Sequence, residues 1–233
     1  MFSELVALMR GSGDFMSIVI HILAILMIIF LVLPFHEWAH AWMASLLGDT
    51  SIKYRGRLSL NPLSHIDYMG ALCLLLFGFG WAKPVPVDDR NFKNPKVGMA
   101  ITALAGPVAN VVAALVGGFI FFGFIAFAPK FAMTTVGLYI ALFLKYYISI
   151  NCSLAAFNLI PIPPLDGSKI LFAFLPDKYV YKFYQYEQIF STVLFALVFL
   201  GVLSIPLGFV QSLLLQLVDF ICSLPFKAFL PTL

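Results

Sequence analysis

Two histidines and a glutamate lie close together in a strongly apolar stretch, in the order His36-Glu37-x-x-His40. Residues four positions apart share one face of a helix, so the two imidazoles can bind a single metal ion. Glu37 lies next to that face, where its carboxylate can take a proton from a metal-bound water. The spacing therefore predicts a hydrolytic metal site. The alternative is a polar network between helices that holds no metal.

Catalytic zinc sites need a third protein ligand, and this pentad does not contain one. Asp166 is the strongest candidate because it follows a proline-rich break, Pro161-Ile-Pro163-Pro164-Leu165, where irregular backbone can aim a carboxylate into a cavity. Asp67 and Glu187 are weaker candidates, since both border polar stretches. The three cysteines lie far apart and form no CxxC pair, which argues against a thiolate site.

The composition is that of a membrane protein. The chain has 233 residues, of which 62% are hydrophobic and 11% are charged, whereas a soluble domain averages about 25% charged residues. The net charge of +3 is too small, and the basic residues are too scattered, to suggest nucleic-acid binding. Residues 1–14 lack the order of a cleaved signal peptide, so we expect the first apolar run to be retained.

Long apolar helices must position the predicted site. A spanning helix needs roughly 20 mainly apolar residues, and three runs are long enough: 15–33, 97–128 and 131–160. The first can continue past Pro34, which should bend it, to a cap near Gly48. A further charge-free run, 188–218, is expected to form two helices or one helix kinked near Pro206.

The region between the first two long runs is more varied. Residues 68–82 are uncharged but too few for an upright span, and their glycines favour a re-entrant or partly extended segment. Residues 83–90 have prolines at alternate positions, which suit an edge strand. We therefore expect an all-α polytopic membrane protein with about five or six transmembrane helices and a small re-entrant β-containing region. One membrane-embedded domain covers 1–233, with a catalytic core at about 15–175 and C-terminal helices at about 183–230.

The motifs, in their order along the chain, resemble the site-2 protease family of intramembrane zinc metalloproteases. His36-Glu37-x-x-His40 is followed much later by Asn158-x-x-Pro161-x-x-Pro164-Leu165-Asp166-Gly167. Three further segments resemble the family's polar loop, its membrane-associated strand region and its second core helix: 56–67, 81–87 and 105–110. The resemblance covers roughly 30–167. Because no segment has room for a PDZ or CBS domain, we expect a minimal-core member.

The resemblance implies a zinc endopeptidase, with one Zn²⁺ per chain, that cleaves within or beside transmembrane segments of other proteins. The metal ligands would be His36, His40 and Asp166. Glu37 would be the general base, and Asn110 would stabilise the developing oxyanion or hold substrate backbone. A substrate helix must unwind before attack, and the extended segment would pair with it by β-augmentation. The residues expected to bind substrate are Lys83, Pro84, Val85, Pro86, Val87 and Asn158.

The distribution of positive charge predicts the orientation in the bilayer. Seven of the 14 Lys and Arg residues fall between the first two long helices, and Lys178 and Lys182 follow the third, which places these segments and the site toward the cytoplasm, with the N-terminus outside. We expect a multi-pass protein of the cell membrane whose partners are transmembrane substrates and lipid; its oligomeric state stays open. Two rival functions also stay open. One is a different HExxH membrane protease that takes its third ligand from Glu187, and the other is a transporter or scaffold without turnover.

Overall fold

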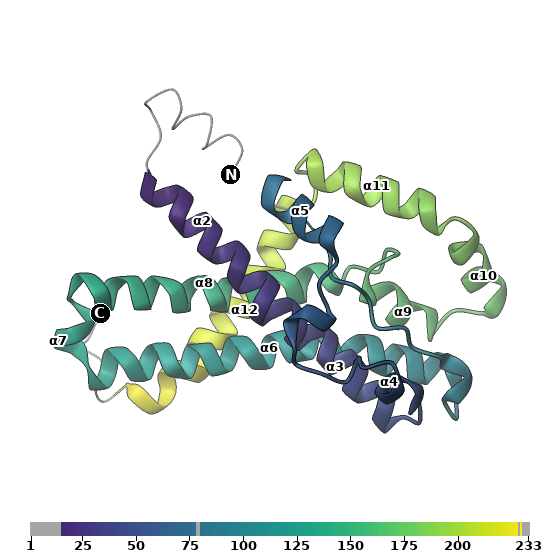
Figure 1. Cartoon of the computed structure of the whole chain (residues 1–233), viewed down its shortest axis with the longest axis horizontal. Coiled ribbons are helices and arrows are strands. Elements are labelled where there is room, and N and C mark those ends of the chain that lie inside the picture. The colour runs from purple at the N-terminus through teal and green to yellow at the C-terminus, as the bar shows by residue number, and fades with distance from the viewer. Residues whose placement is uncertain (1–14, 78–79, 228, 230–233) are drawn as a thin grey trace.

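The computed structural model describes residues 15–77, 80–227 and 229 (Figure 1). The ordered elements of this part of the chain are helices, and no strand occurs among them. The all-α prediction is therefore confirmed for the described residues, whereas the β-containing region is not. The predicted position of the N-terminus concerns residues 1–14, which lie outside the described residues.

The predicted metal-binding pentad lies in the first helical run, which is continuous but changes its winding before Pro34. The run consists of α2 (Phe15–Met27), a π-helical turn η1 (Ile28–Val32) and α3 (Leu33–Leu46). At the end of the turn the N–H of Leu33 donates to Ile28 O, five residues back. Pro34 lacks an N–H and its ring crowds the carbonyl four residues earlier, so a widened turn accommodates it. The helix then ends just before Gly48, whose φ of 121° suits glycine.

Two long helices form the centre of the fold and run side by side in Figure 1. They are α6 (Pro95–Phe127) and α8 (Thr135–Asn158), joined by the short α7 (Pro129–Ala132). Side-chain caps start both: Asn94 accepts from the N–H of Val97, and Thr134 accepts from that of Gly137. Since α6 also contacts α3, α9 and α12, it touches every helix that carries a predicted metal ligand.

The C-terminal part of the chain returns to this centre through four described helices. Their bounds are α9 (Asp166–Phe172), α10 (Asp177–Gln185), α11 (Glu187–Phe199) and α12 (Ser204–Ser223), followed by the turn η4 (Leu224–Phe226). The run 188–218 therefore forms two helices, which are separated by a turn at Gly201 with a φ of 71°. α12 packs on α6 and α8 in a core that includes buried Cys152 and Cys222.

The region between α3 and α6 consists of short helices and extended chain. Its elements are α4 (Ser51–Tyr54), η2 (Pro62–Ser64), α5 (Tyr68–Phe77) and η3 (Asp89–Asn91). Residues 68–77 are helical, which corrects the expectation of a partly extended segment there, whereas a re-entrant path stays a prediction. Asp67 accepts from the N–H of Gly70 at 2.8 Å and starts the helix. Residues 83–88 are extended but form no strand, because two of them are prolines and the other amides bond outside any ladder.

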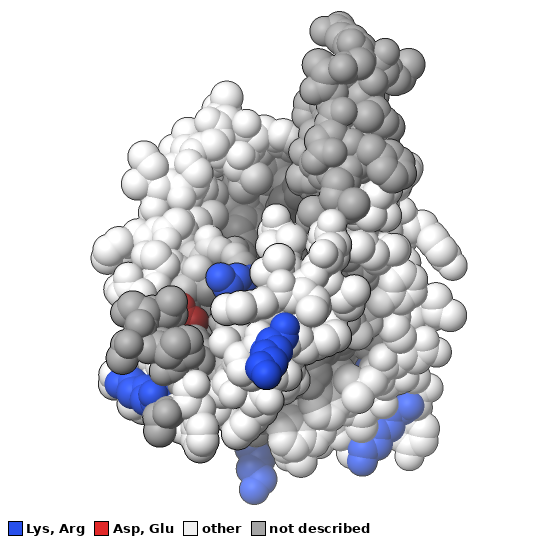
Figure 2. Space-filling model, turned by 90° about the vertical axis from the view of Figure 1, so that its left-hand side faces the viewer, with Lys and Arg blue, Asp and Glu red and all other residues white. Residues whose placement is uncertain are grey.

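Four helical runs in the described residues are long and apolar enough to cross a membrane: Ile22–Leu46, Pro95–Phe127, Thr135–Asn158 and Ser204–Phe226. α11 is apolar but shorter. Figure 2 shows a face on which uncharged side chains predominate and few Lys or Arg residues appear. Large apolar side chains such as Ile120 and Phe127 are exposed on these helices, as in a protein surrounded by lipid. The chain is an integral membrane protein, and the count of five or six spans stays a prediction.

Candidate metal centre

The two predicted histidine ligands lie on one buried face of α3. His36 and His40 are 4% and 7% exposed, and their Nε2 atoms are 3.0 Å apart. The Nδ1–H of His40 donates to the carbonyl oxygen of Thr102 on α6 at 2.7 Å. A neutral His40 held in this way carries its lone pair on Nε2, which is the form that binds a metal. The hydrogen bond therefore makes Nε2 the nitrogen of His40 that could bind a metal.

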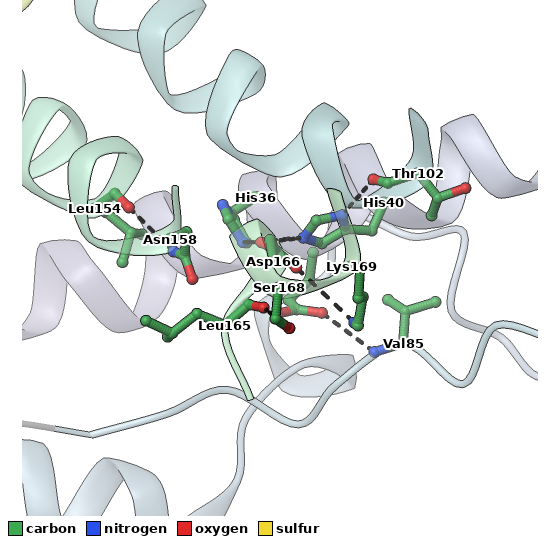
Figure 3. A network of polar contacts seen from close by, with 11 residues as sticks. His36, His40, Val85, Thr102, Leu154, Asn158, Leu165, Asp166, Ser168 and Lys169 are labelled. Atoms are coloured by element: carbon green, nitrogen blue, oxygen red, sulfur yellow. Dashed lines mark hydrogen bonds and ion pairs between the residues drawn. The ribbon is translucent and has the colours of Figure 1, made fainter. Parts of the chain in front are cut away.

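Asp166 joins the two imidazoles from a distant part of the chain. It is the first residue of α9, and its Oδ2 lies 3.3 Å from Nε2 of His36 and 3.1 Å from Nε2 of His40. Figure 3 shows the carboxylate and the two rings turned toward one another. The start of α9 packs closely on the chain that leaves α8, because a Cβ on Gly167 would overlap two carbonyl oxygens there. A glycine after Asp166 thus permits the approach that brings the carboxylate in.

The three converging atoms have the chemistry and spacing of a zinc site. Two imidazole nitrogens and one carboxylate oxygen are a ligand set of catalytic zinc. Ligand atoms about 2.0 Å from a tetrahedral ion lie about 3.3 Å from one another, and the separations here are 3.0, 3.1 and 3.3 Å. Oδ2 of Asp166 is buried and accepts no hydrogen bond from the described residues, as expected of an atom whose partner is an ion. The residues therefore fit the metal.

The charges around Asp166 favour its ionised form. Burial raises the pKa of this carboxyl, but the imidazoles of His40 and His36, when protonated, lower it by more, so without a metal the pKa lies well below its ordinary value. Lys169, one turn further along α9, places its ammonium 3.9 Å from Oδ1, the other carboxylate oxygen. Because metal ligands must be deprotonated, the ionised carboxylate is the form of Asp166 that could bind a metal.

One face of α6 forms the wall opposite the histidines. A Cβ built on Gly106 would overlap Nε2 of His40 and a ring carbon of His36, so this approach requires glycine. Thr102 lies one turn earlier and supplies the carbonyl that orients His40. Asn110 lies one turn later and is completely buried, and its amide nitrogen and oxygen have no hydrogen-bond partner among the described residues. Along this face, successive turns of α6 therefore carry the carbonyl of Thr102, the side-chain-free position of Gly106 and the amide of Asn110, which is unpaired among the described residues.

Glu37 contacts the extended segment of the polar region. The backbone N–H of Val85 donates to its Oε2 at 3.2 Å, although the two residues are 48 positions apart. Figure 3 marks this bond with the dashed line that ends at Val85. The predicted general base and the predicted substrate-binding segment are therefore in direct contact.

A cavity of about 490 Å³ opens onto this group, and its wall includes His36, Glu37, His40, Asp166 and Lys169. Of the predicted substrate-binding residues, four line it: Pro84, Val85, Val87 and Asn158. The wall does not include Lys83, Pro86 or Asn110. A second cavity, of about 560 Å³ and mainly apolar, shares with the first the residues Leu33, Gly80, Leu154 and Phe157. The two cavities therefore have a common wall.

The other candidates for the third ligand have different places in the fold. Within the described part of the chain, the group whose His, Cys, Asp and Glu ligand atoms converge consists of His36, His40 and Asp166. Glu187 begins α11 and does not belong to it, and Asp67 caps α5 instead. Three contributors were not predicted from the sequence: Gly106 as a contact with the rings, Thr102 as the hydrogen-bond partner of His40, and Lys169 as a cavity residue. For Lys169 a signal existed, because it follows Asp166 by one helical turn.

Three features occur together here: helices long enough to cross a membrane, an HExxH pair on one of them, and a distant aspartate close to both histidines. Together they define a class of protein, the intramembrane zinc metalloproteases. The sequence comparisons lead to the same class. The model of peptidase family M50 matches residues 23–201, which is more than half of the chain. The chain belongs to peptidase family M50, the site-2 protease family. This confirms the family resemblance and makes the protein a zinc metalloprotease.

Three relatives are named as candidate zinc metalloproteases. YwhC of Bacillus subtilis is 38% identical over 174 residues, which cover 74% of this chain and 76% of YwhC. Rip2 of Mycolicibacterium smegmatis is 31% identical over 137 residues, covering 57% of this chain and 49% of Rip2. MJ0611 of Methanocaldococcus jannaschii is 31% identical over 141 residues, covering 59% of this chain and 63% of MJ0611. No solved structure matches the chain significantly.

Proposed function

We propose that His36, His40 and Asp166 hold one Zn²⁺ ion and that Glu37 is the general base in hydrolysis of membrane-embedded peptide bonds. The observation that carries the proposal is the convergence of Nε2, Nε2 and Oδ2 within 3.3 Å of one another, beside a glutamate on the cavity wall. Zinc at this place supplies a Lewis acid for the peptide carbonyl and acidifies a bound water.

The protein's own groups move the protons. Glu37 accepts the proton of the attacking water and passes it to the leaving amine. Its place relative to the ligands is set by α3, because it follows His36 directly on the same helix. Asn110 is the proposed donor to the developing oxyanion, and its support is an amide that is buried and unpaired among the described residues. Asn110 does not line the cavity in this structure. Its role therefore requires that a shift of α6, or the way the substrate binds, brings the amide within reach of the carbonyl oxygen.

The substrate site is proposed at the two adjoining cavities. Pro84, Val85, Val87 and Asn158 would hold the unwound backbone next to the metal. The apolar second cavity would take the neighbouring side chains of the substrate's transmembrane segment, because such side chains are apolar and the lining matches them. Lys83 and Pro86 are left out of this narrower set, since their side chains do not form its wall.

We also propose that the chain acts as one membrane-embedded unit in the cell membrane, with its site toward the cytoplasm. The support is charge: basic residues cluster between α3 and α6, the region that adjoins the site at Val85. A catalytic core at about 15–175 contains all four proposed zinc and base residues, and α12 packs on it.

Replacing Glu37 by Gln tests the proposal. The Glu37→Gln protein is expected to retain one zinc per chain and to lose cleavage of a transmembrane reporter by on the order of a hundredfold or more, because the amide cannot accept the proton. Zinc would be measured by elemental analysis of purified protein, and cleavage in proteoliposomes. Cleavage at the wild-type rate would remove Glu37 from the mechanism. Zinc binding without chelator-sensitive cleavage in the wild type would favour a scaffold or transporter.

A further inference from the structure

Residues 83–88, which we call the strap, line part of the cavity wall, and each of their backbone N–H groups already donates a hydrogen bond. Lys83 N–H donates to His65 O at 2.8 Å, and Asp88 N–H donates to Oδ2 of Asp49 at 2.8 Å, so each end is anchored. Between the anchors, two positions are prolines, which have no N–H. The two remaining donors are Val87, which bonds to Val85 O at 3.0 Å, and Val85, which bonds to Glu37.

The bond between the strap and Glu37 has the features of a positioning contact. It joins a backbone donor, held between two anchors, to one oxygen of a carboxylate at the end of a rotatable side chain. It is also the one hydrogen bond that the described residues give to the Glu37 carboxylate. Hydrogen bonds to ionised carboxylates are stronger than neutral ones, so this bond limits the orientations of the side chain. Oε2 is occupied, which leaves Oε1 to accept a proton.

We propose that the N–H of Val85 is a positioning donor that holds Glu37 in its catalytic orientation. The inference rests on the proposed role of Glu37. It also explains why the proline-rich strap has valine at position 85, because a proline there would have no N–H to donate. The alternation Pro84-Val85-Pro86 removes the neighbouring donors and leaves one amide at the base. Val85 acts through Glu37, and its side chain contributes separately to the cavity wall.

The proposal has a consequence for substrate pairing. No amide of the strap is left to donate to a substrate strand while the four bonds persist. A substrate strand would therefore pair through its own N–H groups, donating to strap carbonyls, and would leave the Val85 bond to Glu37 in place. The two-way ladder of ordinary β-augmentation does not form here.

Val85→Pro is the direct test, since proline deletes the N–H and still follows a proline in an extended segment. The matched controls are Val85→Ala, which keeps the amide and loses the side chain, and Val87→Pro, which puts the same ring elsewhere in the strap. We expect kcat of Val85→Pro to fall about tenfold or more below that of either control, because a misplaced base loses rate steeply. The controls are expected to act mainly on KM, because both alter the cavity wall. Zinc content should equal that of the wild type in all three.

If kcat of Val85→Pro matches that of Val87→Pro, or if the whole loss lies in KM, the positioning role is wrong. Should the proline variant fail to fold, valine's α-hydroxy acid at position 85, introduced by nonsense suppression, exchanges N–H for oxygen and keeps the side chain. The same replacement at position 87 is its control, and the same difference in kcat is expected. Failure of this inference can be told apart from failure of the proposed function. If the proposed function is wrong, the wild-type protein itself shows no zinc-dependent cleavage; if only this inference is wrong, the wild type still cleaves.

Discussion

Gly106 and His40 approach so closely that a single added carbon on residue 106 would occupy the space of Nε2 of the imidazole. The contact joins the middle of α6 to the metal-binding face of α3. One turn earlier on α6, the carbonyl oxygen of Thr102 accepts the Nδ1–H of the same ring. The proposed ligand His40 is thus held on one side by a hydrogen bond, and on its other side it packs against a glycine that has no side chain.

Gly106→Ala is expected to weaken zinc binding by about tenfold or more, because the rings must shift by more than a metal bond tolerates. The measurement is a competition titration of purified protein with a chelator of known affinity. Gly123→Ala is the control on the same helix, since a Cβ there meets Phe226 at an ordinary 3.4 Å. Ala normally favours a helix over Gly, so equal zinc affinity in both variants would contradict the packing argument.

Asp166→Ala is expected to lose stoichiometric zinc, whereas Glu187→Ala is expected to retain it. The reason is that Oδ2 of Asp166 lies within 3.3 Å of both imidazole nitrogens, while Glu187 is outside that group. Zinc per chain after dialysis against a weak chelator makes the comparison. The opposite result, with zinc lost from Glu187→Ala alone, would favour the other kind of HExxH protease.

Asn110→Ala is expected to lower kcat by about a hundredfold while zinc binding is unchanged, if the amide donates to the oxyanion as other side-chain donors do. Asn151→Ala is the comparison, because Asn151 is also buried but already donates to Tyr147 O at 2.9 Å. Both variants should be compared in kcat and in thermal stability. A loss of stability without a specific loss of kcat would assign Asn110 to helix packing.

Asp49 anchors one end of the strap by accepting the N–H of Asp88. From its surroundings we predict that the stability of the protein depends on pH. Its buried carboxylate accepts hydrogen bonds from Ser51, Asp88 and Asn91. Burial raises the pKa of this carboxyl, but these bonds together lower it, so the pKa is below its ordinary value in the folded protein. The ionised group therefore stabilises the fold fully above about pH 4, the unfolded pKa, and this contribution is lost as the pH falls through the lower folded value.

Asp49→Asn is accordingly expected to reduce stability at pH 7 by about 2 kcal/mol, which corresponds to a Tm lower by on the order of 5 °C. The difference from the wild type should shrink as the pH falls below about 4. Thermal unfolding in detergent at a series of pH values measures both effects. Asp89→Asn, at an exposed neighbouring position, should show neither. A constant difference at all pH values would show that the charge of Asp49 is not involved.

Local patterns in the sequence were enough to propose the metal ligands and to predict the long helices. His36 and His40 share a face because helix geometry puts residues four apart together, whatever the rest of the chain does. Long apolar runs likewise predicted α6 and α8 within a few residues. Asp166 was found from its proline-rich surroundings and from the family motif, although the distance to the histidines is a tertiary property.

The predictions that were wrong concern segments whose conformation depends on backbone hydrogen bonds that their composition does not reveal. Residues 68–82 are too few for an upright membrane span, and their glycines favoured a re-entrant or partly extended segment, but a cap from Asp67 starts a helix over 68–77. The segment 83–90 was expected to form an edge strand because of its prolines, yet the backbone N–H groups of residues 83–88 donate to Glu37, Asp49, His65 and Val85. Hydrogen-bond partners across dozens of residues have no local signature, so composition alone cannot assign them.

The sequence by itself determined the chemistry: the residue types that bind a metal and move a proton, and the apolar helices that carry them into a bilayer. Side-chain identity and helical periodicity are local, and they can be read from one stretch of chain at a time. The tertiary structure alone decided three relationships. Gly106 packs against the rings of His36 and His40, Glu187 lies outside the group of converging ligand atoms, and the N–H of Val85 donates to Glu37. Those relationships depend on how helices pack, and packing is set by contacts between segments that are remote in the chain.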